Sequence, residues 1–242
     1  EGLSVDALVA MPTLANVLAD PGFWAREPYT GIAWEQVVHA EHELILHTPL
    51  PATGRATGHT RVTALWDRGE GRGAFLQQVR EIRDAASGDL IATARQLNFL
   101  RGDGGLGPGA TVGSPPPPHP MPARAPDVVC DLATSPQAAL LYRLCGDRNP
   151  LHTDPSFAAI GGFDRPILHG LCTYGFSGRA LLSSLCDNDV TRFHHIEGRF
   201  SSPVLPGDAL TVRIWRTGAG EAVFTTSVGD RVVIDQGLVR FS

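Results

Sequence analysis

The chain contains no lysine: all 20 of its basic residues are arginines, set against 25 aspartates and glutamates in 242 residues. The net charge of -5 provides no general basic surface, so we expect no nucleic-acid partner. No apolar run approaches the roughly 18 residues that cross a bilayer, so we expect no membrane insertion. The first residues show no basic segment followed by an apolar one, which predicts no secretory signal and a cytoplasmic location.

Cysteine is also scarce, and no pair shows the C-x-x-C spacing of a redox or zinc motif. We therefore expect free, buried thiols in a reducing compartment. The nine histidines form no H-E-x-x-H, so we predict no metal site. The run GDGGLG lies outside any βαβ unit and does not indicate a dinucleotide site. The four cysteines are Cys130, Cys145, Cys172 and Cys186.

Glycine and proline, in contrast, are concentrated in one segment, residues 101–126, which includes four consecutive prolines. No helix or strand persists through such a run, which favours an extended, semi-rigid spacer. The segment predicts a linker between an N-terminal unit, residues 1–100, and a C-terminal unit, residues 127–242.

Each unit has its own series of β-rich segments bounded by glycine or aspartate turns. The motifs TPLPATG (48–54) and SPVLPGD (202–208) occupy the same place in the two series. A consistent order of elements with weak sequence similarity indicates a duplicated antiparallel unit. The predicted strands are 35–50, 54–69, 73–85 and 90–100, then 194–204, 208–218, 222–229 and 232–241.

Helices are predicted mainly in the second unit, after Ser135-Pro136, after Asp154-Pro155, and over 170–186. The segment 170–186 is mostly apolar yet contains several glycines, which cost roughly 1 kcal/mol each in a helix. Close packing of a curled sheet against the helix would offset that cost. In the first unit, 12–20 favours a helix, whereas proline and glycine interrupt 21–33. We therefore predict an α+β protein with a double hot-dog fold: two antiparallel sheets, each wrapped round a central helix, packed side by side.

The most concentrated polar motif is GDRNPLH, residues 146–152. The proline keeps Asn149 out of the α region, so we expect a bent loop between two helices. In such a loop the Asp147 carboxylate and the His152 imidazole can converge on one site and share acid–base work on a water. Asn149 could orient the substrate or the water. The alternative for this stretch is a capped turn at the surface with no chemical role.

His169-Gly170 begins the long apolar helix. A helix start presents free backbone N–H groups and the positive end of the helix dipole. A thioester carbonyl that gathers negative charge needs such donors. The alternative is a glycine selected only for a tight turn.

These motifs, GDRNPLH, FDRPILHGLCT and RFSSPVLPGD, resemble the hydratase 2 (MaoC-like) family, and most of all the double hot-dog hydratase domain of peroxisomal multifunctional enzymes of type 2. The resemblance implies that Asp147 and His152 are the catalytic pair and that the Gly170 N–H polarises the thioester carbonyl. It implies that the first unit has given up catalysis and accommodates the acyl chain. It also implies that the neighbours of the pair bind the substrate: Arg148, Asn149, Pro150 and Leu151. A second set is implied to bind CoA: His39, Ala40, Arg68 and Phe200. Ala40 departs from the glycine that the family usually has at this position.

The expected activity is therefore that of a hydro-lyase, an (R)-specific 2-enoyl-CoA hydratase that needs no metal or redox cofactor and takes an acyl-CoA thioester as its substrate. Family members often form homodimers. Three alternatives remain open from the sequence: a 3-hydroxyacyl thioester dehydratase of fatty-acid or polyketide synthesis or of sterol side-chain degradation, a non-catalytic acyl-CoA-binding module, and a scaffold subunit. Chain length, direction of the reaction and the division of acid and base roles between Asp147 and His152 are not determined by these motifs.

Overall fold

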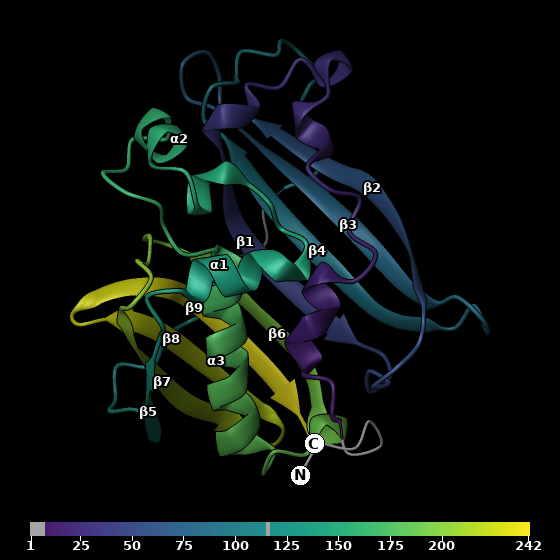
Figure 1. Ribbon diagram of the computed structural model, residues 1–242, viewed down its shortest axis with the longest axis vertical. Coiled ribbons are helices and arrows are strands. Elements are labelled where there is room, and N and C mark those ends of the chain that lie inside the picture. The colour runs from purple at the N-terminus through teal and green to yellow at the C-terminus, as the bar shows by residue number, and fades with distance from the viewer. Residues whose placement is uncertain (1–7, 115–116) are drawn as a thin grey trace.

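The computed structural model describes residues 8–114 and 117–242 of the protein (Figure 1). Its strands form a single nine-stranded sheet in the order β2-β3-β4-β1-β6-β9-β8-β7-β5, with every pair antiparallel. The sheets of the two halves are therefore joined edge to edge where β1 pairs with β6. The strands are β1 Val37–Leu46, β2 Ala56–Asp67, β3 Ala74–Asp84, β4 Leu90–Leu100, β5 Val128–Ala133, β6 Phe193–Phe200, β7 Ala209–Gly218, β8 Glu221–Val228 and β9 Arg231–Phe241.

The C-terminal half is a complete hot dog: its strands curl round α3, Gly170–Leu185 (Figure 1). The predicted strand positions are confirmed, and the double hot-dog fold is confirmed with them. Two details of the prediction are corrected: the two expected sheets are one continuous sheet, and among the described residues only the C-terminal half has a central α-helix. β5 was not predicted, because its burial alternates so that it presents half of its residues to solvent at the sheet edge. Two short helices precede α3: α1 Ala138–Tyr142 and α2 Pro155–Ile160, the latter capped by the Asp154 carboxylate.

The N-terminal half has no α-helix among its described residues. The helix expected over 12–20 is a short 3-10 helix, η2 (Pro12–Val17), that packs against α3, β1 and β4. Proline and glycine punctuate the segment that follows, so only single turns form. These turns are η3 Trp24–Arg26, η4 Pro28–Thr30 and η5 Trp34–Gln36.

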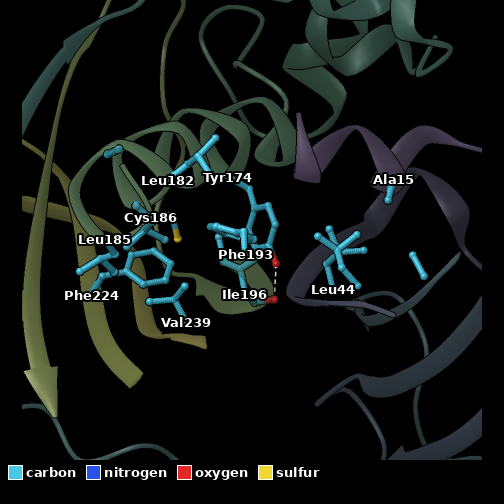
Figure 2. Packing of buried hydrophobic residues seen from close by; sticks show 14 of the residues in the cluster. Ala15, Leu44, Tyr174, Leu182, Leu185, Cys186, Phe193, Ile196, Phe224 and Val239 are labelled. Carbon is cyan, nitrogen blue, oxygen red and sulfur yellow. Dashed lines mark hydrogen bonds between the residues drawn. The ribbon is translucent and has the colours of Figure 1, made fainter. Parts of the chain in front are cut away.

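The main core lies between α3 and the inner face of the sheet (Figure 2). Its largest side chains include Tyr174 of α3, Phe224 of β8 and Leu44 of β1, all fully buried. The hydroxyl of Tyr174 donates a hydrogen bond to the carbonyl of Ile196 at the joint between the halves (Figure 2). Because the core contains residues from both halves, the halves share one packed interior.

Close packing explains the glycines of α3, but their close neighbours include η2 of the first half as well as the sheet. A Cβ at Gly178 would lie 2.6 Å from the Thr13 methyl of η2. At Gly170 it would lie 3.3 Å from the Phe200 ring. Glycine therefore lets the first half's η2 and the end of β6 approach the helix closely, which is the expected offset for its low helix propensity.

The glycine- and proline-rich linker crosses the outer face of the sheet. Gly113 lies over Ala64 and Trp66 of the first half, and Met121 packs on a cluster that includes Trp215 of the second half. Between them, His119 pairs with the Glu197 carboxylate of β6. The inner face is thus left to α3 and the η turns.

Two further expectations can be compared with the structure. All four cysteines are free, as predicted, but only Cys172 and Cys186 are buried, whereas Cys145 is exposed. The exposure of Cys145 corrects the expectation of four buried thiols, because it lies in the η6 turn (Arg143–Cys145) that leads out of α1. Within residues 8–114 and 117–242, no helix is long and apolar enough to cross a bilayer.

Candidate active site

The loop from Asp147 to His152 is both a capped turn and a convergent polar site. Asn149 N–H donates to the Asp147 carboxylate at 3.1 Å, and the Asn149 side chain accepts from Leu151 N–H at 3.0 Å. This second bond caps the short helix η7, Pro150–His152. These turn hydrogen bonds, which a purely structural loop would also have, hold the Asp147 and His152 side chains close to one another.

His152 is held in a defined tautomer. Its Nδ1 lies 2.9 Å from the carbonyl oxygen of Ile167, and a carbonyl can only accept, so Nδ1 carries the proton of the neutral ring. The Nε2 lone pair is then free to accept a proton. Burial lowers the pKa of His152 below 6.5, although the Ile167 bond and the Asp147 charge oppose that shift. The ring is therefore neutral at pH 7.

A second histidine, His169, supports the first. The two rings are stacked with their centroids 3.8 Å apart, and His169 Nε2 lies 3.3 Å from the Asp147 carbonyl oxygen, to which it donates. Burial, and the proximity of His152, lower the pKa of His169 to about 3. The Tyr142 ring also lies beside His169, with the two ring centroids 4.9 Å apart. His169 was missed as a site residue; the signal was its place directly before the glycine that starts the long helix.

The start of α3 lies beside this group. His169 is the N-cap residue, and α3 begins at Gly170, whose N–H has no acceptor within the helix. The Phe200 ring packs against Gly170, and the His39 ring packs edge-on against Phe200 with centroids 4.9 Å apart. Three of the predicted residues, from α3, β6 and β1, therefore meet where the two halves join.

The predicted substrate contacts next to the pair occupy different surroundings. Arg148 is exposed, Pro150 is the first residue of η7, and Leu151 lies against Gly161. Leu151 and Pro150 thus hold the loop, and Arg148 is exposed on it; contacts of these residues with a substrate stay predictions.

Two predicted CoA contacts lie away from this group. Ala40 sits at a β-bulge between His39 and Glu41, which turns its side chain to the outer-face cluster of Ala64 and Trp66. The side chain of Ala40 therefore does not join those of His39 and Phe200 beside Gly170. Its predicted contact with CoA stays a prediction.

Arg68 follows β2, three strands away from β1 in the sheet. It is exposed, and its guanidinium lies over the rings of Phe75 and Phe99, 5.9 and 5.6 Å from their centroids. These cation–π contacts hold the charge at the surface. A contact of Arg68 with CoA also stays a prediction.

In the part of the chain that the structure describes, two clusters combine histidine and carboxylate groups with ligand atoms within 4.8 Å of one another. In the outer one, Arg95 donates to Glu43 at 2.6 Å and lies 3.4 Å from Glu197, so a cation would face a fixed positive charge. The other contains Asp147, His152 and His169 themselves, and in it each ring already uses one nitrogen to bond a backbone carbonyl. The absence of a metal centre stays a prediction.

Comparisons with known proteins agree with this geometry. A family model described as "MaoC like domain" matches residues 119–236, which contain the whole loop and α3. The 3-hydroxyacyl-thioester dehydratase Y of Mycobacterium tuberculosis is 42% identical over 238 residues, covering 96% of this chain and 81% of the relative. The chain belongs to the MaoC-like hydratase family.

Other MaoC-like proteins are similar over nearly the same length. The peroxisomal enoyl-CoA hydratase 2 of Arabidopsis thaliana is 34% identical, over 93% of this chain and 75% of the relative. A crystal structure of a MaoC-like dehydratase from Phytophthora capsici superimposes with a TM-score of 0.83 at 31% identity, over 97% of this chain and 83% of that one. The predicted family is confirmed, and both halves are included in the likeness.

Proposed function

We propose that this MaoC-like enzyme is an (R)-specific 2-enoyl-CoA hydratase. It would add water reversibly to a trans-2-enoyl-CoA and give an (R)-3-hydroxyacyl-CoA. One observation carries the proposal: the neutral His152 ring, fixed by Ile167, directs its free nitrogen to a site that it shares with the Asp147 carboxylate, beside the start of α3.

In this proposal His152 Nε2 is the base. It takes a proton from the water whose oxygen bonds to C3, while the Asp147 carboxylate accepts the water's other hydrogen and holds it in line. The C2–C3 π electrons move onto the thioester as an enolate. C2 then takes the proton back from the His152 imidazolium, so the enzyme returns to its first state and only water has been added.

The enolate oxygen would be stabilised by the free N–H of Gly170 and the dipole of α3. Donors of this kind act where charge develops, and loss of one typically costs about a hundredfold to a thousandfold in rate. Phe200 packs against the glycine and keeps water from this side. The thioester itself is the electron sink, so the proposed reaction needs no redox cofactor or metal.

The same site would run the reaction in reverse, as a 3-hydroxyacyl thioester dehydratase. The likeness to the mycobacterial dehydratase favours keeping this candidate. Rates on crotonyl-CoA, a long enoyl-CoA, an acyl-carrier-protein thioester and a steroid thioester would distinguish acyl-CoA hydration from dehydration in synthesis or in sterol side-chain degradation.

The test is a hydration assay on enoyl-CoA thioesters of several lengths, with chiral analysis of the product. Loss of enoyl absorbance and an (R)-product are expected. An (S)-product would contradict the stereochemical assignment. Tight binding without any loss of absorbance would instead support the acyl-CoA-binding module.

A further inference from the structure

The inner face of the N-terminal half carries a polar band across β1, β4 and β3. His42 pairs in register with Gln96, and Gln96 pairs with Gln78, so the three side chains form one row on the same face. Arg80 and Asn98 lie beside the row on the same face. Gln96 is half-buried and the others are buried, with exposed fractions of 2% for His42, 9% for Gln78, 6% for Arg80 and 9% for Asn98.

The row faces the interior of the protein and not the solvent. His42 packs edge-on against Tyr174 of α3, with centroids 5.3 Å apart. Trp24 of η3 lies over Gln78, in the N-terminal segment that crosses this face of the sheet (Figure 1). A polar row in such a place needs an explanation, because the same face is apolar at Leu44 and at Leu76 on either side.

The hydrogen bonds of the row run in one direction. The indole of Trp24 can only donate, and its Nε1 lies 2.8 Å from Gln78 Oε1. Gln78 Nε2 must then donate to Gln96 Oε1 at 3.3 Å, and Gln96 Nε2 to Asn98 Oδ1 at 2.8 Å. The chain ends at Asn98 Nδ2, which has no acceptor in the described part of the protein and, unlike Asn16 Nδ2, keeps access to solvent.

A second chain starts at a carbonyl and ends in the same way. His39 Nε2 donates to the Glu41 carbonyl at 3.1 Å, which leaves the nearby His42 Nδ1 as an acceptor and makes His42 Nε2 the donor to Asn16 Oδ1 at 3.0 Å. Burial lowers the pKa of both rings, that of His39 to about 4, so each carries a single proton. Asn16 Nδ2 is buried with no acceptor among the described residues, as is Nε of Arg80.

Both chains therefore end in N–H donors, and Arg80 Nε adds a third donor on the same face. The buried donors Asn16 Nδ2 and Arg80 Nε destabilise the protein while they have no partner, and an oxygen atom from a ligand would relieve that cost. The row also begins next to the active site, because His39 contacts Phe200, which packs on Gly170. A plain alkyl chain would gain nothing from these donors.

We propose that this row binds an acyl group that carries an oxygen acceptor in its distal part, such as a keto, hydroxyl or carboxylate group, and that Asn98 determines this specificity. The inference rests on the proposed function for the acyl-CoA part of the ligand. It adds that the substrate is an oxygenated acyl thioester rather than a simple fatty acyl thioester.

The test measures dissociation constants by titration calorimetry for saturated thioesters, which bind without reacting. Decanoyl-CoA is compared with a series of ketodecanoyl-CoA thioesters, each with one keto oxygen, placed at successive carbons in the distal half of the acyl chain. We expect at least one keto thioester to bind about threefold to tenfold more tightly than decanoyl-CoA, the range of one net hydrogen bond. Equal or weaker binding of every keto thioester would overturn the inference.

Two variants and a control locate the effect. Asn98→Asp keeps the oxygen that accepts from Gln96 but replaces the free donor with an acceptor, so the keto preference should vanish. Gln78→Met breaks the chain one strand further away and should weaken the preference. Gln77→Met lies on the opposite face of β3 and should retain it. Retention of the full preference in Asn98→Asp overturns the proposal, and thermal unfolding of each variant shows that it is folded.

The assay also separates this inference from the proposed function. If crotonyl-CoA is not hydrated but the keto preference is present and depends on Asn98, only the hydratase assignment fails. If crotonyl-CoA is hydrated and no preference exists, only the inference fails.

Discussion

The two halves of the protein have similar strands but different contents. In the C-terminal half a 16-residue helix fills the curl of the sheet, and its start meets the Asp147–His152 loop. In the described part of the N-terminal half, from residue 8 onward, only 3-10 turns cover the sheet, and the inner face carries amides, histidine and arginine. A long helix supplies both a core and an N-terminus for chemistry, whereas its absence leaves a face that is available for recognition.

The largest effect is expected in the C-terminal half, at His152, its proposed general base. His152→Gln should lower kcat by about a hundredfold to ten-thousandfold, the usual contribution of general acid–base catalysis, with little change in stability. His47→Gln, at an exposed histidine of the N-terminal half, is the control and should leave kcat unchanged. Steady-state hydration of crotonyl-CoA measures both. Near-normal turnover in His152→Gln would end the assignment.

The second test breaks the contact that joins the halves. Gly178→Ala should destabilise the protein by about 1–3 kcal/mol, because its Cβ would lie 2.6 Å from the Thr13 methyl. Gly175→Ala is a matched control on the same helix, since its nearest neighbour, the Thr13 hydroxyl, is 3.9 Å away. There the alanine should be neutral or stabilise by up to about 1 kcal/mol.

Urea denaturation gives both free energies of unfolding. Thr13→Ser removes the methyl group, so it should restore part of the stability lost in Gly178→Ala. Equal effects of the two glycine substitutions would show that η2 is not held at this point.

The third test uses pH. The pKa of His169 falls from 6.5 to about 3 on folding, because the ring is buried. Between these values the unfolded chain binds a proton that the folded chain refuses, so stability is lost as the pH falls through that window. The free energy of unfolding of His169→Gln should therefore depend less steeply on pH below 6.5 than that of the wild type. Identical slopes would contradict the buried neutral ring.

The smallest effect is expected at the edge of the N-terminal half. Arg68→Ala should raise KM for a CoA thioester about twofold, as for loss of one exposed charge contact, and leave kcat unchanged. The pantetheine thioester of the same acyl group should show no such change. An equal rise in KM for both thioesters would mean that Arg68 only packs on Phe75 and Phe99.

Much of the fold followed from local patterns. Strand alternation, the Asp154-Pro155 helix start and the apolar run after Gly170 each depend on near neighbours and were confirmed. The α-helix predicted over 12–20 was wrong: the segment forms the six-residue 3-10 helix η2, which ends at Val17, shortly before Pro21 and Gly22. β5 was missed because an edge strand needs only half-burial. In the candidate site, Asp147 and His152 were predicted from one motif, whereas the stacking of His169 on His152 could be seen only in the structure.

By itself, the sequence determined eight of the nine strands, the helices of the C-terminal half, the glycine- and proline-rich crossing and the Asp147–His152 motif, because turn chemistry and hydrophobic period act over a few residues. Only the tertiary structure decided the tautomer of His152, through the carbonyl of Ile167, and the meeting of His39 with Phe200 across the joint. It also decided the direction of the two hydrogen-bond chains in the N-terminal half. Each of these depends on groups far apart in the chain, whose distances are set by packing and not by local propensity.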